Sequence, residues 1–141
     1  MSAVPIADLL AEHLVRVQPR GVVSVYVFGS HARATAHAES DVDVAVLFDR
    51  SVLPTAPERT RAAERLAADL IAVTHCNRVD VVSLGNASPE LGAAAVRGGR
   101  RVYCAEAETD HAFVRMVLLR AADLRPFLAR ARRVKLEALA R

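Results

Sequence analysis

The sequence predicts an α/β protein with a small central sheet of about four strands flanked by helices. Three observations indicate this class. Helical and extended hydrophobic patterns alternate along the chain, the extended segments are short and rich in β-branched residues, and 141 residues are enough for one domain with a buried core. We therefore expect a single domain over residues 1–141, with an α/β core in 1–108 and a helical extension in 109–141.

The first half of the chain is expected to hold one helix and two strands. Ile6–Val17 repeats apolar residues at helical spacing and ends before the sequence QPRG. Val22–Phe28 is a short apolar run with β-branched and aromatic residues, which is typical of a buried strand. A second strand is expected over Asp41–Phe48.

The middle of the chain continues the alternation. Pro57–Val73 places its apolar residues on one helical face, and Arg78–Leu84 is a third β-branched segment. Ser88-Pro89-Glu90 is typical of a helix start, because serine can cap the free N–H groups and proline fits the first helical position. We expect that helix to end at Gly98-Gly99.

The C-terminal third is predicted to be one edge strand and a basic helical segment. The sequence RRVYCA favours the strand, and the pattern is helical from Thr109 nearly to the end. Pro126 is expected to kink or split that helix, because proline lacks a donor N–H. Residues 109–141 carry eight Arg and Lys against three Asp and Glu, a net of +5. Such a segment is typical of a solvated helix face, and it also suits contact with nucleic acid, a nucleotide or an acidic protein surface.

Composition and motifs exclude several classes of protein. Cys76 and Cys104 are far apart and no CxxC occurs, which excludes a disulfide framework or metal knuckle and favours the reducing cytoplasm. The N-terminal segment contains Asp8 and Glu12 and lacks a basic start, so it is not a signal peptide, and no window approaches a membrane span. Neither GxGxxG nor GxxxxGK[ST] occurs, which argues against dinucleotide-binding and P-loop proteins.

Carboxylates occur at unusual places in the predicted strands. Asp41 and Asp43 are two residues apart, so alternation places both on one face and the intervening valines on the other. Neighbouring carboxylates repel each other and need either a proton shared between them or a cation, and a hard cation such as Mg²⁺ is the common resolution. Asp80 would complete an acidic triad if its strand lay beside the second. A single such residue would more simply be a solvated strand end, but the three together favour a functional site.

A second candidate feature is Gly29-Ser30, directly after the first predicted strand. Glycine allows close approach of the backbone to a ligand, and a following helix start, the Ser30 hydroxyl and Arg33 could bind phosphate. The pair alone more often marks a plain turn. Combined with the acidic face, it predicts a site for phosphoryl or nucleotidyl transfer, in which two metal ions would hold the attacking and leaving oxygens.

The spacing of these features matches a known signature. The sequence contains the pattern GS-x10-DxD, formed by Gly29-Ser30, ten further residues and Asp41-Val42-Asp43. With this signature the chain resembles the minimal nucleotidyltransferases of the polymerase-β-like superfamily. The resemblance implies a nucleotidyltransferase fold with a mixed sheet. It also implies that Asp41, Asp43 and Asp80 are catalytic and bind Mg²⁺, and that Gly29 and Ser30 hold the triphosphate of ATP. The sequence departs from the family at Ala34, where glycine is usual.

The resemblance also implies a partner. Several minimal nucleotidyltransferases are bacterial antitoxins encoded beside a HEPN-domain ribonuclease toxin. The implied activity is transfer of AMP from ATP to a tyrosine of that toxin, which silences it. Two alternatives stay open: a non-catalytic module that neutralises its partner by contact through the C-terminal helices, and nucleotidyl transfer to a small molecule such as an aminoglycoside. Nucleic acid is not expected as the main substrate, and the sequence leaves the oligomeric state open.

Overall fold

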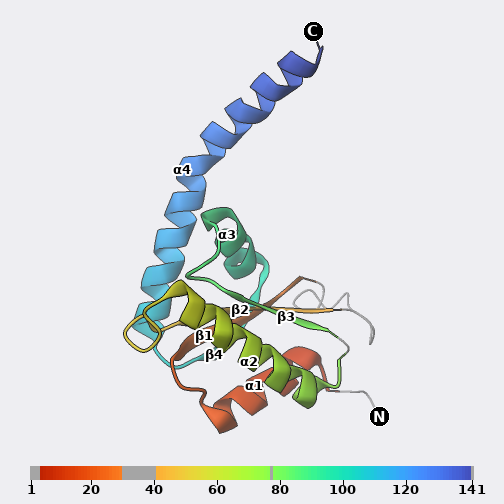
Figure 1. Ribbon diagram of the computed structural model, residues 1–141, viewed down its shortest axis with the longest axis vertical. Coiled ribbons are helices and arrows are strands. Elements are labelled where there is room, and N and C mark those ends of the chain that lie inside the picture. The colour runs from red at the N-terminus through yellow and green to blue at the C-terminus, as the bar shows by residue number, and fades with distance from the viewer. Residues whose placement is uncertain (1–3, 30–40, 77, 141) are drawn as a thin grey trace.

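The structure is a computed structural model that describes residues 4–29, 41–76 and 78–140. The predicted helices and strands are all present, with bounds within two residues of those expected. In chain order they are α1 (Ile6–Val17), β1 (Val22–Phe28), β2 (Val42–Phe48), α2 (Ala56–Thr74), β3 (Val79–Ser83), α3 (Pro89–Gly98), β4 (Arg100–Cys104) and α4 (Ala107–Ala140). Figure 1 shows the sheet between its helices and α4 leaving the body of the protein.

The four strands form one mixed sheet in the order β3-β2-β1-β4. Strand β1 is antiparallel to both β2 and β4, whereas β2 and β3 are parallel. The parallel pair is connected through α2, as such a connection requires. Strands β1 and β2 follow each other in the chain and lie side by side as an antiparallel pair. Strands β3 and β4 form the two edges of the sheet. The expected edge position of the last strand is confirmed.

Hydrophobic cores cover both faces of the sheet. On one face, valines of β1 and β2 pack against α1 and α2, whose Leu10, Leu14 and Leu70 are fully buried. Burying each of these leucines contributes about 1.5–3 kcal/mol. On the other face a smaller cluster of sheet residues packs against α3 and α4. The valines of β2 belong to the first cluster, as alternation predicts, and Asp43 stands at the start of the opposite face.

Local signals explain where the helices begin and end. The side chain of Thr55 accepts a hydrogen bond from the Glu58 N–H at the start of α2, and Ser88 caps α3 in the same way, as expected. Helix α2 ends at His75, which adopts the left-handed conformation common after helix C-termini. The caps at Thr55 and His75 mark the two ends of α2, the helix that connects β2 to β3.

Helix α4 is one continuous helix of 34 residues. The expectation that Pro126 could split it is wrong. Proline removes a single backbone hydrogen bond, and the surrounding sequence is rich in Ala, Leu and Arg, which are strong helix formers. Beyond its base the helix has exposed apolar side chains, with Leu119 67% and Leu139 74% exposed.

Candidate active site

Gly29 ends β1 and adopts a backbone conformation that favours glycine, with a φ of 73°. Its neighbour Phe28 is paired with Asp43 of β2. A Cβ atom on Gly29 would lie only 2.6 Å from Oδ2 of Asp43, closer than such contacts occur. The backbone angle therefore favours glycine here, and any side chain would force the Asp43 carboxylate to move. The close approach brings Gly29 directly beside the DxD motif.

The register of the parallel strands brings two of the predicted aspartates together. Asp43 of β2 is the direct partner of Asp80 of β3, so their side chains leave the same face of the sheet on neighbouring strands. Asp41 is exposed and immediately precedes β2. The condition that the sequence left open for Asp80, that its strand lie beside the second predicted strand, is met. The sheet order places Asp43 between Gly29 and Asp80.

The side chains of the three aspartates do not form a ready-made metal site among the described residues. Asp80 is half exposed and accepts a 3.3 Å hydrogen bond from Nε of Arg78, which is itself exposed. Within the described ranges, no three His, Cys, Asp or Glu side chains gather in an arrangement that could hold a metal ion. The chemistry of the donors still fits a hard divalent cation, because all three are carboxylates, and Gly29 lets the backbone lie close to one of them. Releasing Asp80 from Arg78 costs little, since exposed ion pairs are weak.

Three positions named from the sequence lie outside the described residues. These are Ser30 and Arg33, predicted to bind phosphate, and Ala34, the departure from the family pattern. Their predicted roles stay predictions.

Sequence reasoning missed a buried polar network on the same face of the sheet. Asp110 of α4 is 1% exposed and accepts hydrogen bonds from the hydroxyls of Ser24 (2.6 Å) and Tyr26 (2.7 Å) and from Arg101 (2.9 Å). The network joins β1, β4 and α4. Ser24 and Tyr26 are two residues apart in an otherwise apolar strand, so their hydroxyls share one face. That spacing was the available signal for a polar partner.

The network shifts the pKa values of its members in opposite directions. Burial opposes ionisation of Asp110, but the hydrogen bonds from Ser24, Tyr26 and Arg101 outweigh it and lower the pKa of this carboxyl below its ordinary value. Burial, followed by the hydrogen bond to Asp110, raises the pKa of Tyr26 well above its ordinary value. Asp110 is thus a buried anion that anchors the base of α4 to the sheet.

The class of protein to which this fold belongs is shown by a family comparison. Residues 12–108 match the family model of polymerase beta nucleotidyltransferases. The chain therefore belongs to this nucleotidyltransferase family, as its signature indicates. No curated protein matches the chain.

Solved structures extend the similarity beyond the family core. One named as a candidate minimal nucleotidyltransferase is 30% identical, with 71% of this chain and 98% of that chain covered and a TM-score of 0.53. A chain of a toxin–antitoxin crystal structure with AMP-PNP is 24% identical, with 96% and 98% covered and a TM-score of 0.61. A chain from the complex of a tri-AMPylated Shewanella oneidensis HEPN toxin with its MNT antitoxin is 20% identical, with 96% and 98% covered and a TM-score of 0.59. The last two share the fold of this chain, including α4.

Among the helices in the described ranges, none has the length and apolar content needed to cross a membrane.

Proposed function

We propose that this protein is a cytoplasmic antitoxin that transfers AMP from ATP to a tyrosine of a HEPN ribonuclease toxin and so neutralises it. The observation that carries the proposal is that Asp43 lies opposite Asp80 on the neighbouring strand and close to Gly29, just after β1, in a nucleotidyltransferase fold. The toxin–antitoxin structures with the same fold, one with AMP-PNP and one with an AMPylated toxin, support the choice of nucleotide and partner.

In the proposed reaction the tyrosine oxygen attacks the α-phosphorus of ATP. A new O–P bond forms, the bond from the α-phosphorus to the bridging oxygen breaks, and pyrophosphate leaves with that electron pair. Asp80 is the candidate to accept the proton of the hydroxyl. Gly29 allows the triphosphate to approach the backbone beside Asp43, and Ser30 and Arg33 are proposed to bind its oxygens.

Asp41, Asp43 and Asp80 are the residues that would hold Mg²⁺. When bound, a divalent cation neutralises the charge of the phosphates and polarises the reacting oxygens. The chain's own contribution is to supply three oxygen donors on one face of the sheet and to keep that face clear of bulky side chains at Gly29.

The proposed partner is a HEPN protein encoded beside the gene, and the test is transfer of label to that protein in the presence of Mg²⁺. We expect label from α-³²P-ATP to appear on that protein, no label from γ-³²P-ATP, and loss of transfer in the double variant Asp41→Ala/Asp43→Ala. Asp49→Asn, at the far end of β2, is the matched control and should retain transfer.

The same experiment separates catalysis from neutralisation by contact. If the wild-type protein inhibits the ribonuclease without transferring label, and the double variant inhibits equally, the chain acts as a binding module and the proposed activity is wrong. If the double variant still transfers label, the assignment of the two aspartates is wrong.

A further inference from the structure

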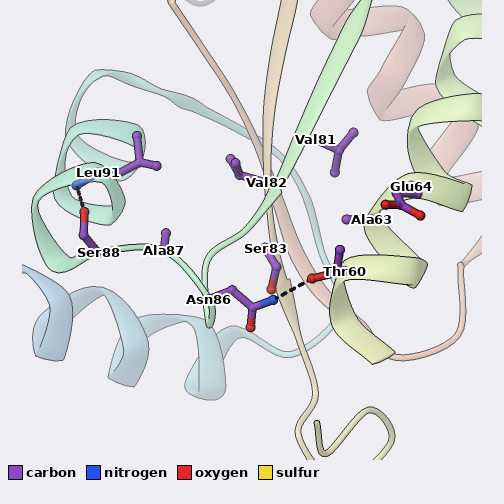
Figure 2. Close-up of a pocket in the computed structure, with 10 residues that line it drawn as sticks. All are labelled: Thr60, Ala63, Glu64, Val81, Val82, Ser83, Asn86, Ala87, Ser88 and Leu91. Carbon is purple, nitrogen blue, oxygen red and sulfur yellow. Dashed lines mark hydrogen bonds between the residues drawn. The ribbon is translucent and has the colours of Figure 1, made fainter. Parts of the chain in front are cut away.

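A pocket of about 500 Å³ opens along the outer edge of β3. It lies between α2 and the start of α3 and therefore crosses the edge of the sheet, as Figure 2 shows. Because β3 is an edge strand, no other strand of the described chain occupies this side. A pocket of this volume is large enough for one long side chain together with part of its backbone.

The lining combines apolar walls with polar groups that are not needed to hold the protein together. Ala63, Val81 and Leu91 supply apolar surface. Ser83 is only 6% exposed, and its Oγ has no hydrogen-bond partner. Glu64 on α2 is exposed and makes no ion pair within the described residues. A buried hydroxyl without a partner is unusual in a folded protein, which points to a ligand that supplies one.

Asn86, by contrast, is already committed to the fold. Its amide donates to Oγ1 of Thr60 (3.2 Å, dashed in Figure 2) and to the Ala56 carbonyl, and its carbonyl oxygen accepts from Arg59. These bonds tie the loop after β3 to α2. The pocket therefore has a fixed wall, and Glu64 and Ser83 are the groups left for a ligand.

The backbone of β3 is arranged to pair with an added strand. The Arg78 carbonyl accepts from Val42 and the Leu84 N–H donates to Val46, so both residues direct their backbone groups toward β2. Successive residues of a strand direct their backbone groups to alternate sides, and Val81 is three residues from both Arg78 and Leu84. Its N–H and C=O therefore point away from β2, toward the outer edge where the pocket lies. Exposed edges of this kind bind extended peptide segments through main-chain hydrogen bonds.

The pocket also lies on the side from which an acceptor must come, an argument that rests on the function proposed above. In-line displacement requires the attacking oxygen and the leaving pyrophosphate on opposite sides of the α-phosphorus. Gly29, which we place beside the phosphates, directly follows β1, and Asp80 is on β3, with Asp43 of β2 between them. The acceptor hydroxyl accordingly approaches from the β3 edge, where the pocket begins one residue beyond Asp80.

We propose that this pocket is an acceptor subsite, which binds an extended segment of the target protein along β3 and holds a lysine or arginine three residues from the modified hydroxyl. Ser83 is three residues from Asp80, or about 10 Å along a strand. Because side chains alternate along a strand, two residues three positions apart lie on opposite faces of the sheet. Asp80 is on the face that packs against α3, whereas Ser83 is on the face that packs against α2, as is Glu64. The alkyl stem of the basic residue lies on Val81 and Ala63, its charge meets Glu64, and Ser83 gains a partner.

Synthetic hexapeptides with tyrosine and lysine three positions apart, in both orders, test the assignment. The matched peptides replace lysine by norleucine or glutamate. Binding to the full chain is followed by ¹⁵N–¹H NMR titration. We expect the lysine peptide of one order to shift the amides of Val81 and Ser83, and to bind about three- to fivefold more tightly than the norleucine peptide, as a partly exposed ion pair allows.

Two variants assign the effect to the pocket. Glu64→Gln, at an exposed position that does not threaten folding, should remove the preference for lysine. Glu58→Gln on the same helix lies outside the pocket lining and should leave the preference unchanged. Absence of binding, shifts elsewhere on the surface, or a lysine preference that survives Glu64→Gln would each overturn the subsite. Label transfer to the intact HEPN protein by the wild-type chain is measured separately, so the subsite can fail while the proposed activity stands.

Discussion

Replacing Gly29 by alanine tests the geometry that joins the Gly-Ser turn to the DxD motif. Alanine at a φ of 73° is strained by about 1–2 kcal/mol. The new methyl would also start 2.6 Å from Oδ2 of Asp43, and contacts below 3.0 Å are not tolerated. The carboxylate must therefore move by roughly half an ångström or more, since van der Waals contacts between heavy atoms lie near 3.5 Å.

The two effects are measured by different assays. The strain should lower the free energy of unfolding by about 1–2 kcal/mol and the Tm by about 3–10 °C. Displacement of a reacting group by up to about 1 Å costs as much as 100-fold in rate, so we expect transfer to fall by about 10- to 100-fold. The ¹³C shift of the Asp43 carboxyl should change as well, which reports the displacement without depending on activity.

Gly98→Ala is the matched control. Gly98 is the last residue of α3, and no heavy atom lies within 4 Å of its added Cβ. Alanine there should leave transfer unchanged and stability unchanged or up to about 1 kcal/mol higher. Wild-type transfer and an unaltered Asp43 signal in Gly29→Ala would refute the argument that this glycine sets the position of Asp43.

Three further variants probe other contacts. Asp110→Asn should lower stability by about 2–4 kcal/mol, less than for a fully buried pair because Arg101 is 40% exposed. The folded protein lowers the pKa of Asp110, so the stability difference between wild type and variant should be full at pH values above 3.8, the ordinary pKa, and should shrink as the pH falls through the lower pKa of the folded state. Denaturant titrations at pH 3–7 measure the stability difference and its pH dependence. A difference that does not change with pH would contradict the charge assigned to Asp110. Gly92→Ala should cost about 1–3 kcal/mol by urea unfolding, because its Cβ would lie 2.8 Å from Val117 between α3 and α4. Asp80→Asn should abolish label transfer while changing stability by less than about 1 kcal/mol, as its pair with Arg78 is exposed; a large loss of Tm would instead give Asp80 a structural role.

The fold followed from the sequence because its local signals agree with its long-range contacts. The β-branched strands, the Ser88 cap and the terminal glycines of α3 each determine an element through its nearest neighbours in the chain. Strand order and direction were not accessible in this way, since they depend on pairings such as Asp43 with Asp80 that no local pattern encodes. The continuity of α4 was missed for a related reason: one proline is a strong local signal, but the preferences of many flanking residues outweigh it.

The site was predictable only in part. The spacing of Asp41 and Asp43 indicates a shared face, and the parallel register adds Asp80 at a position that the sequence left conditional. The Asp110 network was not predicted, because its four residues come from three elements and meet only in the folded chain. The close contact between Gly29 and Asp43 was not predicted either. The sequence suggests that glycine lets a ligand come close to the backbone, and the structure shows that the Asp43 carboxylate also lies close to it.

The position of each aspartate in the sheet explains the difference in their surroundings. Strands β1 and β2 are paired on both sides, so Asp43 and the strand that leads into Gly29 are held by hydrogen-bonded ladders. Strand β3 is paired on one side only, and Asp80 is exposed and bound to Arg78. The strand that carries Asp43 is therefore held on both sides, while the strand that carries Asp80 has an open edge. An enzyme that modifies a protein benefits from this asymmetry, because ATP has a constant shape whereas the acceptor segment must be accommodated along an open edge.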